Sequence, residues 1–322
     1  MKGYVQKVYG EADVLSYEDV EKPAVGSDDV LVRVHAAAVD PGVWHVMAGL
    51  PYPIRLAGYG FRVPKTRVRG DLSGRVEAVG ENVTRFRVGD EVFGTCDGAF
   101  AEYACGPADK FAPKPPSLSF EQAATIPVSA CTALQALRNR GQVQAGQRVL
   151  IIGAAGGIGT FAVQLAKSFG AEVTGVCSTT KMELVRSIGA DDVIDYTRED
   201  FADGVRRYDL ILDTAGNRSL SHLRRALTPQ GTLVIVGGEG GGRWFQSLSR
   251  QLLGALLTPF VGQKLRTLLG TQPQEDLAFL TELIEAGKLT PVIDRTYPLS
   301  EVPDAIRYLS AGHARGKIVI TV

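Results

Sequence analysis

The chain has 322 residues, of which 45% are hydrophobic, and its 35 acidic and 35 basic residues give a formal net charge of zero. A chain of this size and composition can bury one large hydrophobic core or two smaller ones. The balanced charge offers no electrostatic attraction for nucleic acid or for an anionic membrane, so neither is expected as a partner. The four cysteines include no C-x-x-C pair, so we expect no disulfide, no structural zinc and a cytoplasmic, reducing location.

The first part of the chain, from residue 4 to about residue 124, consists of short strand patterns separated by glycine and proline turns. Residues 30–34 and 73–79 show the alternating hydrophobicity that is typical of half-buried strands. Repeated strand-and-turn units without long helices favour a compact β domain, such as a partly open barrel. Helical spacing begins at residues 121–137, so we place the end of this domain at residue 124.

From residue 148 onward, short hydrophobic strands alternate with helical segments. Strands are expected at residues 148–152, 172–177, 192–194, 210–213 and 232–236. This alternation predicts an α/β fold with a doubly wound parallel sheet, whose ligands bind at the carboxyl ends of the strands. We therefore assign residues 125–270 to a dinucleotide-binding domain, and residues 1–124 plus 271–322 to a second domain that binds the substrate.

A glycine-rich turn after the first of these strands is the strongest motif in the sequence. Residues 153–159 contain four glycines, and apolar residues at helical spacing follow. Aligning the G-x-G-x-x-G pattern on Gly156 and Gly159 puts Ala154 at the first glycine position, where alanine is tolerated if its φ is negative. Such a turn lets the backbone approach a pyrophosphate, which the N–H groups of the following helix attract. We infer a dinucleotide site, with simple packing of the glycines as the alternative.

The residues after the second strand indicate which nicotinamide cofactor is used. An Asp or Glu at this strand tip usually holds the adenosine ribose of NADH, but here Ser178, Thr179, Thr180 and Lys181 follow the strand. Hydroxyls and a lysine can hold a 2′-phosphate, which a carboxylate would repel. Tyr196, at the tip of the third strand, can add a hydrogen bond. The pattern favours NADPH, while a solvated Lys181 and a packing role for Tyr196 are the alternatives.

Several motifs taken together carry a family resemblance. They are GDLSGRV (residues 70–76), VGDEVFG (88–94), AFAEY (99–103), GAAGGIGTFAVQLAK (153–167), GAD (189–191), DY (195–196) and RGKIV (315–319). Over nearly its whole length the chain resembles the medium-chain dehydrogenase/reductase superfamily. Within that superfamily it is similar to the zinc-free quinone oxidoreductase and ζ-crystallin group. The resemblance implies a Rossmann domain inserted into a GroES-like barrel domain, and a homodimer formed by pairing edge strands of two nucleotide domains.

The positions that hold catalytic zinc in alcohol dehydrogenases of this superfamily are occupied by other residues here. The resemblance places the first ligand position at Asp40 and the second at Asp71. Converging thiolate or imidazole ligands are missing, so we expect no metal site. Without a Lewis acid, the accessible chemistry is hydride transfer from NADPH to a quinone or another α,β-unsaturated carbonyl. An NADP-dependent alcohol dehydrogenase or carbonyl reductase and a non-catalytic NADPH-binding protein are the alternatives.

The resemblance also suggests which residues form the site. The predicted catalytic residues are Asp40, Tyr52 and Thr132. An Asn commonly occupies the Asp40 position in related quinone reductases, and Tyr52 lines a pocket or packs in the core. The predicted cofactor-binding residues are Gly156, Gly157 and Ile158 for the pyrophosphate, Ser178, Lys181 and Tyr196 for the 2′-phosphate, and Ala215, Gly216, Gly237 and Gly238 for the ribose and nicotinamide.

Overall fold

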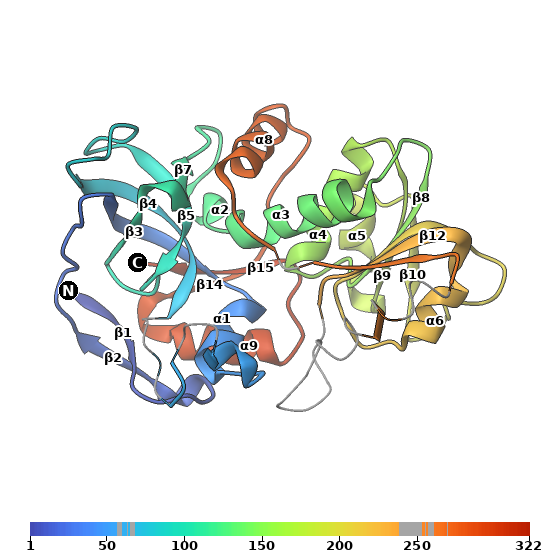
Figure 1. Cartoon of the computed structure of the whole chain (residues 1–322), viewed down its shortest axis with the longest axis horizontal. Coiled ribbons are helices and arrows are strands. Elements are labelled where there is room, and N and C mark those ends of the chain that lie inside the picture. Colours follow the sequence, from blue (N-terminus) through green and yellow to red (C-terminus); the bar gives the residue numbers. More distant parts are fainter. Residues whose placement is uncertain are drawn as a thin grey trace. The chain divides into compact units, whose positions relative to one another are not determined.

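The computed structural model describes residues 1–56, 60–62, 64, 68–237, 253–254, 256, 261–268 and 270–322. It divides into two compact units (Figure 1). Unit 1 comprises Met1–Ser129, Gln272–Ala286 and Pro291–Val322, and unit 2 comprises Ala130–Thr271 and Gly287–Thr290. In the described part of the chain, no helix has the length and apolar character needed to cross a membrane.

Unit 2 contains a six-stranded, fully parallel sheet. Its strands are β8 (Arg148–Ile152), β9 (Glu172–Cys177), β10 (Asp192–Asp195), β11 (Tyr208–Asp213), β12 (Leu227–Ile235) and β13 (Lys264–Thr267). They lie in the order β10-β9-β8-β11-β12-β13, and every neighbouring pair is parallel. The strand order reverses between β8 and β11, which is the point where doubly wound sheets bind dinucleotides. The predicted α/β fold with a doubly wound sheet is confirmed.

Helices cover both faces of this sheet (Figure 1). They are the π-helix η4 (Gln135–Gly141), which continues α3 (Pro127–Leu134), and the helices α4 (Gly157–Ser168), α5 (Met182–Ser187) and α6 (Leu220–Arg225). Helix α4 packs on β8 and β9, α5 packs on β9 and β10, and η4 packs on β11 to β13. Right-handed crossovers from β8 to β10 place α4 and α5 on one face, and the reversed direction places α6 on the other. Strands covered on both faces explain the continuous hydrophobic runs in the sequence.

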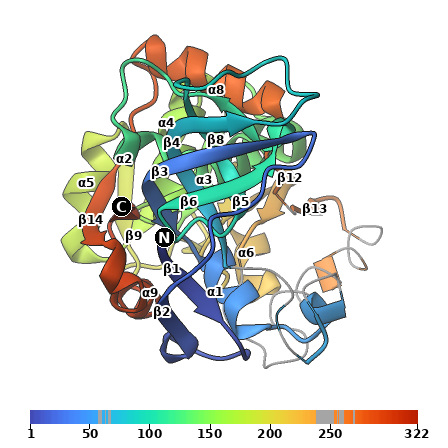
Figure 2. The ribbon, with the colours of Figure 1, turned by 90° about the vertical axis from the view of Figure 1, so that its left-hand side faces the viewer.

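Unit 1 is built around a mostly antiparallel sheet (Figure 2). Its strands are β3 (Asp29–Val39), β4 (Arg69–Val79), β5 (Glu91–Asp97), β6 (Tyr103–Pro107), β7 (Phe111–Pro113), β14 (Ile293–Pro298) and β15 (Lys317–Thr321), beside a hairpin of β1 (Lys2–Gln6) and β2 (Leu15–Asp19). The order is β14-β15-β3-β4-β5-β7, and β6 also pairs with β3. The long strand β3 therefore pairs with three strands, which bends the sheet around one core.

The core of unit 1 lies inside this bent sheet. Fully buried side chains from β4, β5 and β15, such as Leu72, Val92 and Ile318, pack there with Met47 of helix α1 (Pro41–Ala48). Unit 1 also contains the helices α2 (Phe120–Ala123), α8 (Gln274–Glu285) and α9 (Val302–Ser310). Because β15 pairs with β3 in antiparallel register, the end of the chain completes the sheet that the first 124 residues begin.

Candidate functional site

The turn between β8 and α4 brings backbone atoms unusually close together. A Cβ atom built on Gly159 would lie 2.1 Å from the carbonyl oxygen of Gly153. Gly153 itself has φ +83°, a left-handed value that L residues rarely adopt. The N–H groups of Gly153 and Ala154 both donate to the carbonyl oxygen of Val176, each at 3.1 Å. Glycine is therefore required at Gly153 and Gly159, and the hydrogen bonds to Val176 hold the turn against β9 between the end of β8 and the start of α4.

The beginning of α4 has the properties of an anion site. Gly156 is the N-cap residue, and Gly157 and Ile158 form the first turn, where no described side chain caps the helix. Among the residues that the structure describes, a Cβ atom on Gly156 would meet the oxygen of Gly153 alone, at 3.3 Å. The turn is therefore open around Gly156. A helix of this length with an uncapped, glycine-lined N-terminus fits the pyrophosphate of a dinucleotide.

The three residues predicted to bind a 2′-phosphate follow two neighbouring strands. Ser178 follows β9, and Lys181 ends the short helix η5 (Thr179–Lys181). The Lys181 N–H donates to the Ser178 carbonyl oxygen at 2.9 Å. Tyr196 follows β10, is 46% exposed, and its N–H donates to the carbonyl oxygen of Cys177 at 3.1 Å. The structure therefore brings Ser178, Lys181 and Tyr196 to one edge of the sheet.

Asp195 is a polar residue at this edge that the sequence analysis did not assign to the site. It ends β10 opposite Cys177 in the register of the two strands. Its carboxylate accepts hydrogen bonds from the Thr179 hydroxyl and from both the N–H and the hydroxyl of Thr197. The sequence prediction looks for a carboxylate only at the tip of β9 and takes Tyr196 alone from the tip of β10. The carboxylate at the tip of the next strand was the signal that could have revealed this contact.

The turns after β11 and β12 form the other half of the candidate site. Asp213 is fully buried, and its carboxylate accepts a hydrogen bond of 2.9 Å from the N–H of Gly216, which has φ +68°. Ala215 lies half-buried in the same turn. A Cβ atom on Gly237 would lie 2.1 Å from the carbonyl oxygen of Thr214. These turns pack directly on each other, and Gly238 lies outside the described residues.

The predicted catalytic residue Asp40 is the N-cap of α1. Its Oδ1 atom accepts hydrogen bonds from the N–H groups of Gly42 at 2.7 Å and Val43 at 3.3 Å. The Oδ2 atom accepts no hydrogen bond from any residue that the structure describes. Asp40 is 6% exposed. The carboxylate thus has one oxygen committed to the helix and a second oxygen available for another contact.

Tyr52 and Thr132, the other two predicted catalytic residues, lie on different elements. Tyr52 follows the end of α1, and the Arg55 guanidinium lies 4.9 Å from the centre of its ring. Helix α1 and the three residues after it therefore separate Tyr52 from Asp40 in the sequence. Thr132 belongs to α3 in unit 2, is 6% exposed, and its hydroxyl oxygen would lie 2.6 Å from a Cβ atom on Gly270.

Asp71 belongs to a buried polar cluster in unit 1. Its carboxylate is fully buried and accepts hydrogen bonds from the Thr95 hydroxyl at 2.6 Å and the Val128 N–H at 3.0 Å. The ammonium group of Lys317, which is 2% exposed, donates to the Ser129 hydroxyl at 2.9 Å. Burial raises the pKa of Asp71 to about 7, although the charge of Lys317 opposes the shift.

The carboxylates of Asp40 and Asp71 do not fit a zinc site. Asp71 uses both carboxylate oxygens for protein hydrogen bonds, Asp40 uses one oxygen to cap a helix, and the nearby Lys317 ammonium would repel a cation. In the described ranges of the chain, no group of three or more His, Cys, Asp or Glu residues could hold a metal ion. Zinc sites in proteins need converging thiolate, imidazole or carboxylate ligands.

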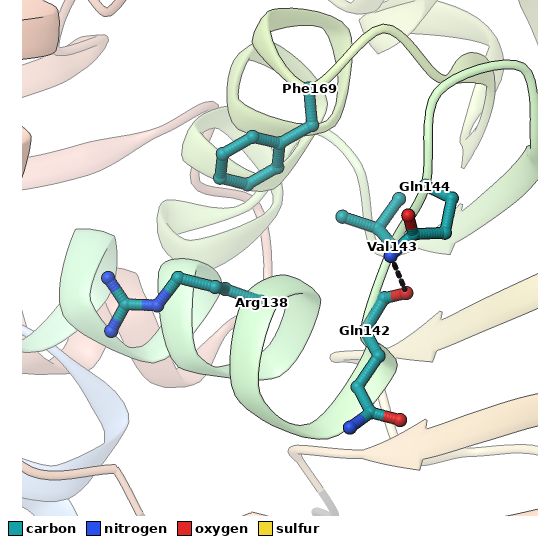
Figure 3. A pocket seen from close by; sticks show the side chains of 5 residues that line it. All are labelled: Arg138, Gln142, Val143, Gln144 and Phe169. Atoms are coloured by element: carbon teal, nitrogen blue, oxygen red, sulfur yellow. Dashed lines mark hydrogen bonds between the residues drawn. The ribbon is translucent and has the colours of Figure 1, made fainter.

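A separate hollow of about 470 Å³ lies elsewhere in unit 2 (Figure 3). It is lined by Arg138, Gln142, Val143, Gln144 and Phe169. Four of these residues precede β8 and Phe169 follows α4, so the hollow lies toward the amino end of β8. None of its residues belongs to the candidate dinucleotide site.

Comparisons with known proteins agree with this geometry. Residues 26–116 match the alcohol dehydrogenase GroES-like domain, and residues 188–320 match the zinc-binding dehydrogenase model. The chain is 33% identical to the mitochondrial NAD(P)H oxidoreductase RTN4IP1 of Mus musculus, over 100% of this chain and 89% of that protein. It is 34% identical to a chloroplastic NADPH-dependent alkenal/one oxidoreductase of Arabidopsis thaliana, over 99% and 79%.

A solved structure shares the whole fold. The quinone oxidoreductase of Coxiella burnetii superposes with a TM-score of 0.85 at 31% identity, covering 100% of this chain and 99% of that one. Matches of this length and identity show membership of the family. The chain is an NAD(P)H oxidoreductase of the medium-chain dehydrogenase/reductase superfamily, and it belongs with the quinone oxidoreductases of that superfamily.

Proposed function

We propose that the protein transfers hydride from NADPH to a quinone or to another α,β-unsaturated carbonyl, and that it does so without a metal ion. The observation that supports the metal-free mechanism is the cluster around Asp71. Its carboxylate oxygens accept hydrogen bonds from Thr95 and Val128, and the nearby Lys317 ammonium donates to Ser129, an arrangement that does not suit a metal ion. The similar proteins include a quinone oxidoreductase and an alkenal/one oxidoreductase, and their names support this class of hydride acceptor.

The preference for NADPH rests on the residues at the ends of β9 and β10. Ser178 and Tyr196 offer hydroxyl donors and Lys181 offers a positive charge, and all three follow adjacent strands. Charge-assisted hydrogen bonds to a phosphate are among the strongest that side chains form. A 2′-phosphate, which NADH lacks, would meet these donors. We therefore assign the 2′-phosphate to Ser178, Lys181 and Tyr196.

Bound NADPH supplies the hydride, and the protein's part is binding and orientation. Gly156, Gly157 and Ile158 would hold the pyrophosphate at the start of α4, where the helix dipole favours negative charge. The tightly packed turns at Ala215, Gly216 and Gly237 would bring the backbone close to the ribose and nicotinamide. Gly238, which lies outside the described residues, is assigned to the same contact. A rigid backbone at these turns fixes the direction in which the nicotinamide ring faces, which is the main requirement for hydride transfer.

We assign substrate contacts to Asp40, Tyr52 and Thr132. Asp40 keeps its Oδ2 atom free of described hydrogen-bond partners, and Tyr52 offers an aromatic face beside a guanidinium. An electron-poor acceptor needs no strong acid to accept hydride, so contacts that orient it suffice. The Asp40 carboxylate can accept a hydrogen bond at the site but cannot donate one to the carbonyl oxygen of the acceptor. The edge position of β13 supports the homodimer proposed from the family resemblance, and the four free cysteines support a reducing compartment.

The test compares reductants and acceptors on the purified, chelator-treated protein. Consumption of NADPH and NADH is followed by nicotinamide absorbance with benzoquinone, with acrolein and with propanal, the saturated counterpart of acrolein. We expect faster consumption of NADPH than of NADH with benzoquinone or acrolein, and little with propanal. Activity on propanal that disappears with the chelator and returns with zinc would favour a metal-dependent carbonyl reductase. Binding of NADPH without turnover of any acceptor would favour a non-catalytic protein.

A further inference from the structure

The Asp195 carboxylate connects the loops that follow two strands of the unit 2 sheet. Its side chain is 3% exposed. The Oδ2 atom accepts a hydrogen bond from the hydroxyl of Thr179, in the loop after β9. The Oδ1 atom accepts from the hydroxyl of Thr197 at 2.7 Å and from its N–H at 3.0 Å, in the loop after β10. One buried side chain therefore holds both loops.

This carboxylate is ionised and its charge is balanced by its surroundings. The hydrogen bonds, above all the one from Thr179, hold the pKa of Asp195 below its ordinary value. The exposed Arg198 places its Nε atom 3.6 Å from Oδ2 and adds an opposite charge. A carboxylate that faced a phosphate directly would repel it, whereas this one directs both oxygens toward protein donors.

The hydrogen bond from Thr179 to Asp195 also affects which side chains at this edge of the sheet can donate a hydrogen bond to a ligand. A threonine hydroxyl has one proton, and Thr179 gives that proton to Asp195. Thr179 therefore presents only acceptor capacity to a ligand. Ser178, Lys181 and Tyr196, to which we assign the 2′-phosphate, lie on the same two loops that the Asp195 contact connects.

We infer that Asp195 is a positioning residue for the 2′-phosphate of NADPH: its link to Thr179 fixes the turn with Ser178 and Lys181 relative to Tyr196. The inference rests on the proposed use of NADPH. Asp195 ends β10, so it does not occupy the tip of β9, where a carboxylate would indicate NADH. Asp195 acts through the loops and does not itself contact the cofactor.

The experiment measures binding of two fragments of the cofactor, adenosine 2′,5′-bisphosphate and adenosine 5′-monophosphate, by isothermal titration calorimetry. The ratio of the two Kd values isolates the contribution of the 2′-phosphate. For Asp195→Ala we expect binding of the bisphosphate to weaken about tenfold, as lost hydrogen bonds to a charged group do, while binding of the monophosphate changes less than about twofold. Thr179→Val, which keeps the side-chain shape, should reproduce most of this change.

Two further variants separate positioning from general damage. In Asp195→Asn the amide oxygen can still accept the hydrogen bonds from Thr197, and the amide nitrogen can donate to the Thr179 hydroxyl oxygen. This variant should therefore bind the bisphosphate to within about threefold of the wild type. Asp191→Ala removes a carboxylate just before the other end of β10, where Asp191 pairs with Lys167, and should leave the ratio of Kd values unchanged.

The possible results are distinct. If Asp195→Ala and Thr179→Val weaken both fragments equally, or neither, the positioning role is wrong while the proposed function stands. If the wild type binds the two fragments equally, the preference for NADPH fails and this inference fails with it. Should Asp195→Ala not fold, the milder Thr179→Val decides between these outcomes.

Discussion

The ammonium group of Lys317, on the last strand of the chain, donates a hydrogen bond of 2.9 Å to the hydroxyl of Ser129 in the first turn of α3. The carboxylate of Asp71, on β4, accepts a hydrogen bond from the N–H of Val128 in the same turn. Residues far apart in the sequence thus hold the start of one helix inside unit 1. Burying the opposite charges of Lys317 and Asp71 is tolerated because each group also has a protein hydrogen-bond partner.

Removing one charge of this cluster should destabilise the protein more than removing both. Lys317→Met leaves the buried carboxylate of Asp71 without an opposite charge, which costs about 3–5 kcal/mol in comparable sites. Adding Asp71→Asn removes that charge, so the double variant should regain part of the loss. The check is urea unfolding of the wild type, both single variants and the double variant at pH 8. Strictly additive changes in the free energy of unfolding would show that the two groups do not interact.

The raised pKa of Asp71 predicts how stability depends on pH. In the unfolded chain an aspartate has a pKa of about 3.9, whereas burial raises the pKa of Asp71 to about 7 in the folded protein. Between these values only the folded state keeps the proton. The contribution of Asp71 is therefore fully present below about pH 4 and is lost as the pH rises through 7, by at most about 1.4 kcal/mol per pH unit.

Asp71→Asn does not titrate and serves as the reference for this effect. The free energy of unfolding of the wild type minus that of Asp71→Asn should fall steadily when both are measured from pH 4.5 to 7.5. Other carboxylates contribute equally to both proteins and cancel in the difference. A difference that stays constant or rises with pH would contradict the prediction.

Variants of Asp40 can separate its helix cap from its proposed substrate contact. Asp40→Ala removes the acceptor of two N–H groups at the start of α1 and should cost about 1 kcal/mol of stability. Asp40→Asn keeps both oxygen positions occupied by polar atoms, so stability and turnover should both remain close to those of the wild type. Asp40→Ser keeps the cap but removes the second polar atom, and should lower turnover about tenfold. Full turnover in Asp40→Ser would limit Asp40 to capping.

Two glycines in one turn should respond differently to alanine. Gly159→Ala places a Cβ atom 2.1 Å from a backbone oxygen, and the resulting shift should cost at least about 2 kcal/mol. Gly156→Ala meets the same oxygen at 3.3 Å and should fold with nearly normal stability, while binding NADPH more weakly. Thermal unfolding and NADPH titration of both variants test this. Equal thermal stability of the two would mean that the turn can relax around Gly159.

Replacing Lys181 should weaken the use of NADPH but not that of NADH. Lys181→Ala removes the positive charge assigned to the 2′-phosphate, so we expect KM for NADPH to rise about tenfold or more and KM for NADH to change less than about twofold. Arg186→Ala removes a positive charge from the far end of α5 and is the matched control. Equal effects of Lys181→Ala on both cofactors would contradict the 2′-phosphate assignment.

Much of the fold follows from local patterns in the sequence. The hydrophobic run of β8 and the glycines after it predict a buried strand, a tight turn and a helix, because each depends on neighbours in the chain. The cap of α1 could also have been predicted, since an Asp before a Pro at the first helical position is a helix start. The family resemblance supplied what local patterns could not, namely the barrel domain and the C-terminal return.

The missed features depend on contacts between distant residues. The Asp195–Thr179 hydrogen bond forms because β9 and β10 are adjacent and end at the same level, which no single window of sequence reveals. Lys317 is buried although lysine is rarely buried, so its partner Ser129, 188 residues away, was not anticipated.

The close backbone approaches at Gly159 and Gly237 bear on how this family changes during evolution. Both glycines are required by the oxygen atoms that face them, whether or not a nucleotide is bound. A descendant that lost its cofactor but kept its fold would retain both, while Ser178, Lys181 and Tyr196 would drift. Retained glycines in such a lineage would therefore record ancestry, and the hydroxyls and lysine at the ends of β9 and β10 would record whether the cofactor is still used.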